Sequence, residues 1–177
     1  MLAIGIIDCQ KDFMNKDGAL YVPNSETIKE KIKRLIKKTK APLFFTADEH
    51  DGTEPEMKVN GGLFPIHCMK QTVGQQLIIN PENRPVFTKR CYNVFDEQYG
   101  NKDIKNWLFN NSITEVDLCG VVGNICVEAA TMGLIKLNIK TTIITNAVVW
   151  MDLGENNNEA TSKNRMACAG VKFIWNK

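Results

Sequence analysis

One cysteine in the sequence has a position that suits nucleophilic chemistry. Cys126 follows an apolar run and the short turn at residues 122–125, at the start of an expected helix. A helix N-terminus stabilises negative charge and lowers a thiol pKa, which favours the thiolate that attacks carbonyl carbons. The first backbone N–H groups of a helix can also hold a developing oxyanion. Position alone leaves a second interpretation open, because cysteines on apolar helices are commonly buried core residues.

Two charged residues at the ends of other apolar runs are candidates to act with this cysteine. Asp8 ends the run at residues 2–7, where a carboxylate is unfavourable unless it has a partner. Its carboxylate could instead cap nearby backbone amides. Lys89 follows the short run at residues 86–88, where a lone lysine would ordinarily face solvent. Neither residue identifies a reaction by itself.

A small group of potential metal ligands follows another expected strand. Asp48 and His50 lie two residues apart there, and the only other histidine of the chain is His67. An aspartate and a histidine at this spacing in a loop can both turn toward one ion, and a second histidine completes an open three-ligand site. Loop histidines are also common surface groups, so the spacing leaves both interpretations open.

Apolar runs alternate with helical patterns along the whole chain, and these elements must position the candidate residues. The expected strands cover residues 2–7, 42–46, 86–88, 116–121, 139–145 and 171–175. The expected helices cover residues 25–38, 73–77, 103–109, a stretch from about 126, and 157–169. This order predicts one α/β domain over residues 1–177, with a doubly wound, mostly parallel six-stranded sheet and helices on both faces. Ligands of such sheets bind beyond the carboxyl ends of the strands, where the candidate residues fall.

Composition and charge argue against several other classes of protein. The 177 residues carry a net charge of +2, which is too small to indicate a nucleic-acid partner. The basic residues at 29–40 alternate with apolar residues at helical spacing, so we expect the solvated face of an amphipathic helix. The apolar start of the chain ends at Asp8, well short of a signal sequence or a membrane span. We therefore expect a cytoplasmic protein with six reduced cysteines and no membrane partner.

Three motifs in the same order resemble those of the isochorismatase-like cysteine hydrolase superfamily. Residues 7–13 (IDCQKDF) resemble its first motif, Asp-x-Gln-x-Asp-Phe, and Lys89 with residues 92–95 (YNVF) resembles its lysine motif. Residues 120–127 (GVVGNICV) resemble its nucleophile motif. The resemblance covers nearly the whole chain. It implies a cysteine-dependent amidohydrolase with a Rossmann-like α/β fold.

The resemblance implies a role for each catalytic candidate. Asp8 would take the proton of the Cys126 thiol, and Lys89 would stabilise the resulting charges. The thiolate would then attack an amide carbonyl and form a thioester with loss of ammonia. Backbone N–H groups of Val122 and Cys126 would form the oxyanion hole, next to a cis peptide bond between Val121 and Val122.

Two further motifs resemble the nicotinamidase (pyrazinamidase) branch of this superfamily. Asp-x-His at residues 48–50 and aromatic-Pro-x-His-Cys at residues 64–68 are both present. The resemblance implies a divalent metal, zinc or alternatively iron or manganese, that binds the ring nitrogen of nicotinamide. Its implied ligands are Asp48, His50 and His67, with Glu56 as the candidate for a further ligand and Glu54 as the alternative. The aromatic residues implied to line the substrate pocket are Phe13, Phe64 and Tyr92.

The resemblance predicts a nicotinamidase that produces nicotinate and ammonia in NAD salvage. Gly123 and Asn124 depart from the usual Thr-Asp of nicotinamidases, and Asn93 replaces a serine. The alternative is a metal-free cysteine amidase of the same superfamily that acts on another small amide. A flavodoxin-like binding module is disfavoured, because the loop at residues 9–13 is badly suited to cradle a phosphate. Members of the family tend to form homo-oligomers, although no interface can be read from this sequence.

Overall fold

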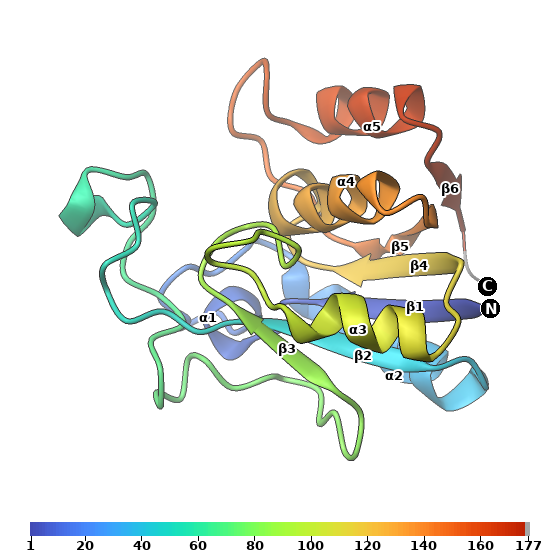
Figure 1. Ribbon diagram of the computed structural model, residues 1–177. Coiled ribbons are helices and arrows are strands. Elements are labelled where there is room, and N and C mark those ends of the chain that lie inside the picture. The colour runs from blue at the N-terminus through green and yellow to red at the C-terminus, as the bar shows by residue number, and fades with distance from the viewer. Residues whose placement is uncertain (176–177) are drawn as a thin grey trace.

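The computed structural model describes residues 1–175 and is built on a six-stranded sheet (Figure 1). The strands are β1 (Leu2–Ile7), β2 (Leu43–Asp48), β3 (Val86–Lys89), β4 (Glu115–Gly120), β5 (Lys140–Val148) and β6 (Lys172–Ile174). Their order in the sheet is β3-β2-β1-β4-β5-β6, and neighbouring strands are parallel throughout. The predicted α/β fold is confirmed. The last two residues of the expected domain, 176–177, lie outside the described residues.

The chain starts at the centre of the sheet and builds it outward in both directions. β1 is followed by β2 and β3 on one side, and the chain then returns to place β4, β5 and β6 on the other. The direction of winding therefore reverses between β1 and β4, and the loops that follow these two strands diverge. Such a switch point leaves a crevice at the carboxyl ends of the strands, which is the expected place for a ligand.

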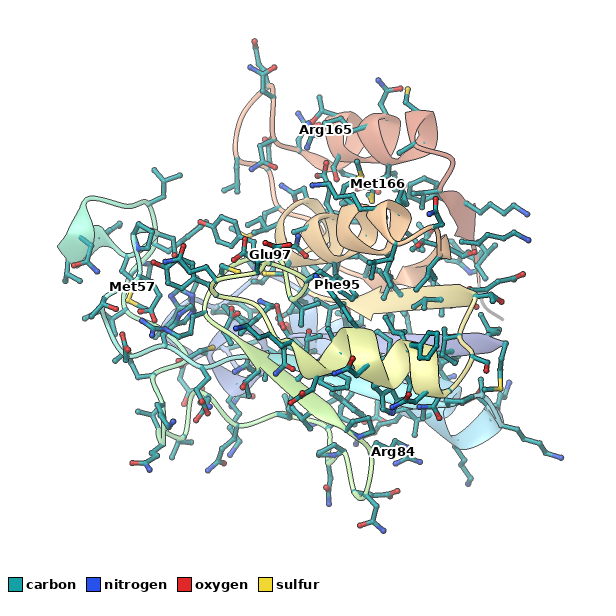
Figure 2. All side chains as sticks on the ribbon, viewed as in Figure 1. Met57, Arg84, Phe95, Glu97, Arg165 and Met166 are labelled. Atoms are coloured by element: carbon teal, nitrogen blue, oxygen red, sulfur yellow. The ribbon has the colours of Figure 1, made fainter. Side chains whose placement is uncertain are left out.

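Helices cover both faces of the sheet (Figure 1). The α-helices are α1 (Lys11–Met14), α2 (Lys29–Lys38), α3 (Asp103–Asn110), α4 (Glu128–Lys136) and α5 (Glu159–Cys168). Short helical turns, named η1 to η3, occupy Ser25–Ile28, Lys58–Asn60 and Gly123–Val127. One apolar cluster includes Leu108, Leu134 and Met166 from α3, α4 and α5, and a second includes Met14 and Ile32 from α1 and α2. Met166 is fully buried between α5 and α4 (Figure 2).

The amphipathic pattern at residues 25–38 forms a helical segment as predicted, with η1 followed directly by α2. Ile32 and Leu35 are buried, whereas Lys33 and Arg34 between them are exposed, so the basic residues form a solvated face. A pattern of this period places apolar residues on one side of a helix. Among residues 1–175, no helix is long and apolar enough to cross a lipid bilayer.

The helix predicted at residues 73–77 is wrong, because this segment forms turns. Its backbone is bonded to the segment around α1 instead: Asp12 N donates to Gly74 O, and Lys11 N donates to Gln76 O. The carboxylate of Asp12 also fills the space beside Gly74 that a Cβ would occupy. Apolar periodicity over five residues cannot reveal a pairing with a distant segment.

Phe44 in β2 offers a test of the core. Its side chain is 1% exposed, and its ring centroid lies 6.1 Å from that of Phe87 and 5.5 Å from that of Trp107. We expect Phe44→Ala to lower the free energy of unfolding by about 3–5 kcal/mol, since it removes a buried ring and leaves a cavity. The same substitution at Phe109, which is 84% exposed, should change it by less than about 0.5 kcal/mol. Urea denaturation measures both variants, and equal losses would contradict this description of the core.

Candidate active site

The carboxyl ends of four neighbouring strands bring the predicted catalytic residues together. Asp8 directly follows β1, Asp48 is the last residue of β2, and Lys89 is the last residue of β3. Asp48 and Lys89 are register partners in the β2–β3 pair. Cys126 lies in η3, the helical turn that follows β4. Four segments that are distant in the sequence thus meet at the switch point of the sheet.

A buried lysine links these residues. The ammonium nitrogen of Lys89 lies 3.6 Å from Cys126 Sγ and donates a hydrogen bond to Asp48 Oδ1. It also lies 2.8 Å from Asp8 Oδ2, in an ion pair without hydrogen-bond alignment. The hydroxyl of Thr46 donates to the other oxygen of Asp8 at 2.6 Å. All five side chains are buried, which the charged ones tolerate because each carboxylate contacts the ammonium.

Burial sets the protonation of the nucleophile. It raises the pKa of the Cys126 thiol well above its ordinary value, and the Lys89 ammonium opposes this effect only in part. The expectation that the helix start lowers this pKa is therefore wrong for the resting site, because burial outweighs it. Burial also raises the pKa of Asp8, against the opposing charge of Lys89. A neutral thiol needs a base, and an Asp8 oxygen lies within 4.8 Å of the Cys126 sulfur.

The two residues that depart from the usual nucleophile motif join this turn to the segment after β5. Gly123 packs against the ring of Trp150, where a Cβ would overlap the ring, so the usual threonine does not fit. Asn124 Nδ2 donates to Asn157 Oδ1 at 2.7 Å, and Asn124 Oδ1 accepts from Met151 N at 3.0 Å. The departures therefore fix the position of a segment that contributes to the pocket described below.

The predicted metal ligands lie beside this centre. Ligand atoms of Asp48, His50 and His67 lie within 4.8 Å of one another, and all three residues are buried. His67 Nδ1 lies 2.7 Å from Pro65 O and so carries the proton of the neutral ring, which leaves Nε2 free to bind an ion. Both ring nitrogens of His50 are buried without a hydrogen-bond partner, an unfavourable state that an ion bound to one of them would relieve in part. Despite burial, Lys89 and His50 lower the pKa of Asp48 to about 2, so its carboxylate is ionised. These residues fit a divalent metal.

The two candidate glutamates differ in what their carboxylates contact. Glu54 accepts hydrogen bonds from Arg90 Nε and from the backbone N–H groups of residues 51–52, at distances of 2.7–3.1 Å. Its Oε1 lies 3.5 Å from His50 Nδ1. Glu56 Oε1 lies 3.9 Å from the other ring nitrogen, Nε2. Because the oxygens of Glu54 are already bonded within the protein, Glu56 is the better candidate for a further ligand.

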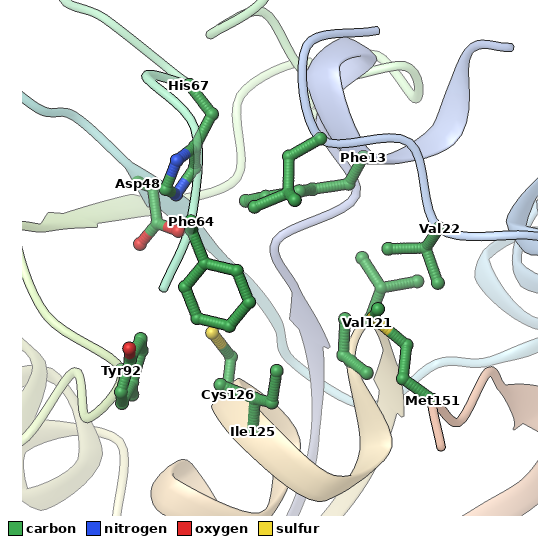
Figure 3. A pocket seen from close by; sticks show the side chains of 12 residues that line it. Phe13, Val22, Asp48, Phe64, His67, Tyr92, Val121, Ile125, Cys126 and Met151 are labelled. Atoms are coloured by element: carbon green, nitrogen blue, oxygen red, sulfur yellow. The ribbon is translucent and has the colours of Figure 1, made fainter. Parts of the chain in front are cut away.

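A pocket opens over the sulfur of Cys126 (Figure 3). Asp48 and His67 form its polar end, and most of its wall is apolar. The lining includes the three aromatic residues predicted from the sequence, Phe13, Phe64 and Tyr92. Sequence reasoning missed the other apolar side chains of the wall, which are Leu20, Val22, Val121, Ile125 and Met151. Leu20, Val22 and Met151 come from irregular segments, where no periodic pattern marks a buried position.

Comparison with known proteins identifies the family. A family model described as Isochorismatase domain matches residues 3–174. The chain belongs to this family. It is 24% identical over 185 residues to the nicotinamidase of Saccharomyces cerevisiae, covering 81% of this chain and 86% of the yeast protein. The structure of the pyrazinamidase of Pyrococcus horikoshii in complex with zinc matches with a TM-score of 0.87 and 27% identity, over 99% of each chain.

A second solved structure is also similar to this chain. The pyrazinamidase/nicotinamidase from Streptococcus mutans UA159 matches with a TM-score of 0.81 and 26% identity, over 98% of this chain and 100% of that one. The predicted membership of the isochorismatase-like superfamily is thus confirmed. The cis peptide bond expected before Val122 from this family resemblance is present, and Val122 lines the pocket beside Cys126.

Lys89→Met tests how far the site depends on its cation. The change leaves the buried carboxylates of Asp8 and Asp48 without their opposite charge, so we expect the free energy of unfolding to fall by about 3–5 kcal/mol. The matched variant Lys33→Met removes an exposed ion pair with Glu30 and should change it by less than about 1 kcal/mol. Urea denaturation at neutral pH with a chelator present measures both. Similar values for the two variants would show that the buried ammonium does not stabilise the site.

Proposed function

We propose that the chain is a nicotinamidase, which hydrolyses nicotinamide to nicotinate and ammonia through a thioester on Cys126. One observation carries the proposal: Asp48 belongs both to the group around Lys89 and to the group with the two histidines, beside a thiol in an apolar pocket. The relatives named as nicotinamidase and pyrazinamidase support the same substrate class. In this proposal the enzyme is cytoplasmic and its product enters NAD salvage.

The first half of the proposed reaction uses the groups around Lys89. Asp8 accepts the proton of Cys126, and the Lys89 ammonium, 3.6 Å from the sulfur, stabilises the thiolate. The sulfur attacks the carboxamide carbon, and the carbonyl oxygen takes the negative charge of the tetrahedral intermediate. Backbone N–H groups of Val122 and Cys126 are the proposed donors to this oxygen. Asp8 then gives its proton to the amide nitrogen, the C–N bond breaks, and ammonia leaves.

The second half regenerates the thiol with one water molecule. Asp8, again ionised, takes a proton from the water as its oxygen attacks the thioester carbon. The C–S bond breaks, the sulfur of Cys126 recovers a proton from Asp8, and nicotinic acid is released. It then loses its remaining proton to solvent and becomes nicotinate. The raised pKa of Asp8 suits this exchange, since a carboxyl group with an ordinary pKa would return a proton less readily near neutral pH.

The proposed metal site consists of Asp48, His50 and His67, with Glu56 as a further ligand. Zinc is the proposed ion, with iron and manganese as the alternatives. An ion bound there supplies a Lewis-acid contact for the pyridine nitrogen of nicotinamide. Burial lowers the pKa of His67 and so favours the neutral ring that coordinates metals.

The shape of the pocket supports an aromatic amide. The ring centroid of Phe13 lies 5.5 Å from that of His67, and the ring centroid of Phe64 lies 6.3 Å from that of Tyr92 (Figure 3). A flat ring placed among these side chains would carry its carboxamide toward the sulfur of Cys126 and its nitrogen toward the histidines. The alternative, a metal-free amidase that acts on another small amide, lacks a use for the buried histidine pair.

The identity of the nucleophile can be tested directly. Cys126→Ala should abolish ammonia release from nicotinamide, because no other group in the proposed scheme forms the acyl intermediate. The control Cys168→Ala, at an exposed cysteine of α5, should retain most of the activity. Mass spectrometry of a rapidly quenched reaction should find the nicotinoyl group on Cys126. An adduct on Cys91 or Cys119 instead would overturn the assignment.

Substrate choice tests the metal site. Benzamide has nearly the shape of nicotinamide and the same carboxamide, but it has no ring nitrogen. We expect kcat/KM for nicotinamide to exceed that for benzamide by about 10⁴-fold in the metal-loaded enzyme, because a site built around a polar substrate group rejects an analogue without it. Chelation, or His50→Ala, should narrow this gap chiefly by losing the nicotinamide reaction.

Metal analysis of the same samples is the control for this experiment. If metal-free protein cleaved nicotinamide normally, or if benzamide reacted equally well, the proposed metal site would be wrong. The metal-free amidase would then be the better description, and a panel of small amides would identify its substrate.

A further inference from the structure

The segment that follows β1 carries three polar side chains, those of Asp8, Gln10 and Asp12, which contact different parts of the site. Asp8 has a left-handed backbone with φ of 47°, and its carbonyl accepts a 2.7 Å hydrogen bond from Gln10 N. α1 begins directly after this turn. Asp8 contacts Lys89, whereas Gln10 binds the backbone at the end of β2 and Asp12 binds the backbone at Cys68. The proposed reaction uses Asp8 and gives no role to Gln10 or Asp12.

Gln10 binds the backbone of Asp48. Its side chain is fully buried, Oε1 accepts from Asp48 N at 2.7 Å, and Nε2 donates to Asp48 O at 2.8 Å. Nε2 also donates to Gln75 O at 2.8 Å. The backbone of Asp8 makes the preceding contact between these segments, through its N–H to Thr46 O. The Gln10 amide thus extends the hydrogen bonding between β1 and β2 beyond the end of β1. It fixes the backbone that carries the Asp48 carboxylate.

Asp12 binds the backbone next to His67. Its Oδ2 accepts from Cys68 N at 2.7 Å, and its Oδ1 accepts from Ala19 N at 3.1 Å. Cys68 has a φ of 45°, a conformation unfavourable for a residue with a Cβ, so it persists only where surrounding contacts enforce it. The absence of a Cβ at Gly74 makes room for the same carboxylate.

The contacts of Cys68 extend this arrangement to the second histidine, because its carbonyl accepts a 3.1 Å hydrogen bond from His50 N. We propose that Gln10 and Asp12 are positioning residues that hold the three metal ligands at the spacing an ion requires. The inference rests on the metal site proposed above. One short segment then serves the whole site, since it supplies the base and also fixes the ligands.

Zinc affinity of the purified chain tests this proposal. Gln10→Met removes three hydrogen bonds at nearly constant side-chain length, and Asp12→Ala removes both carboxylate bonds. Competition with a chromophoric chelator should show zinc binding weakened by about 10–100-fold in each variant. Asp12→Asn keeps one acceptor oxygen and should recover part of this loss. The absorption spectrum of bound cobalt(II) should also change in Gln10→Met and Asp12→Ala, because it reports the coordination geometry.

Ser25→Ala is the matched control. Ser25 is fully buried, and its hydroxyl donates to Phe13 O at 2.9 Å in the same segment without contacting a ligand-bearing strand or loop. This variant should lose thermal stability but keep the zinc affinity and the cobalt spectrum of the wild type. Gly74→Ala displaces the Asp12 carboxylate without removing it and should weaken zinc binding as Asp12→Ala does. It replaces Asp12→Ala if that variant does not fold.

The outcomes separate this inference from the proposed function. The positioning role would be overturned if Gln10→Met bound zinc as tightly as the wild type and if Asp12→Ala, or Gly74→Ala in its place, did so too. An equal loss of affinity in Ser25→Ala would overturn it too, because any buried hydrogen bond in the segment would then have the same effect. If the wild-type chain bound no zinc, the proposed metal site would be overturned and this inference with it.

Discussion

The geometry of the candidate site is organised around the ammonium of Lys89, which is buried between the carboxylates of Asp8 and Asp48. Removing ions from water is strongly unfavourable, so two neighbouring carboxylates are buried here only with a cation between them. β2 and β3 end at Asp48 and Lys89, and Asp8 directly follows β1. The ion pairs of Lys89 therefore hold the ends of three strands together, in addition to the backbone hydrogen bonds of the sheet. A lysine suits this place because its compact ammonium can contact both carboxylates and the sulfur at once.

Asp48 connects the reacting groups with the proposed metal site. Its Oδ1 accepts from Lys89, and its Oδ2 lies 3.7 Å from His50 Nε2. One buried residue thus contacts both the lysine beside the nucleophile and the first histidine, which constrains the distance between them. In nicotinamide, the distance from the carboxamide carbon to the ring nitrogen is likewise set by a rigid ring. This constraint supports the proposed rigid aromatic amide over a flexible one.

Local patterns in the sequence were sufficient to predict the sheet and the residues at its edge. An apolar run that ends at a charged residue marks both Asp8 and Lys89, and parallel strands necessarily bring such residues to one side. The pKa of Cys126 could not be predicted in this way, because it depends on burial and on charges from three strands. The prediction of a helix at residues 73–77 was wrong for a related reason, because contacts with a distant segment decide the structure there. The backbone of these residues is bonded to α1, far away in the sequence.

The segment between β2 and β3, which carries both histidines, is held by a network of polar contacts in addition to buried apolar side chains such as Met57 and Ile79. Arg90 binds Glu54, Asp51 and Thr53 within or next to it, while Val59 and Leu63 are largely exposed. Such a network has no sequence period, which explains why spacing alone left the metal site open. The sheet and its core hold the groups that are proposed to cleave the C–N bond, whereas this segment holds the groups that would select the ring. Different interactions stabilise the sheet and the segment between β2 and β3. We therefore expect that a substitution in this segment can alter substrate choice without unfolding the sheet. Asp48, the last residue of β2, is where the two parts meet.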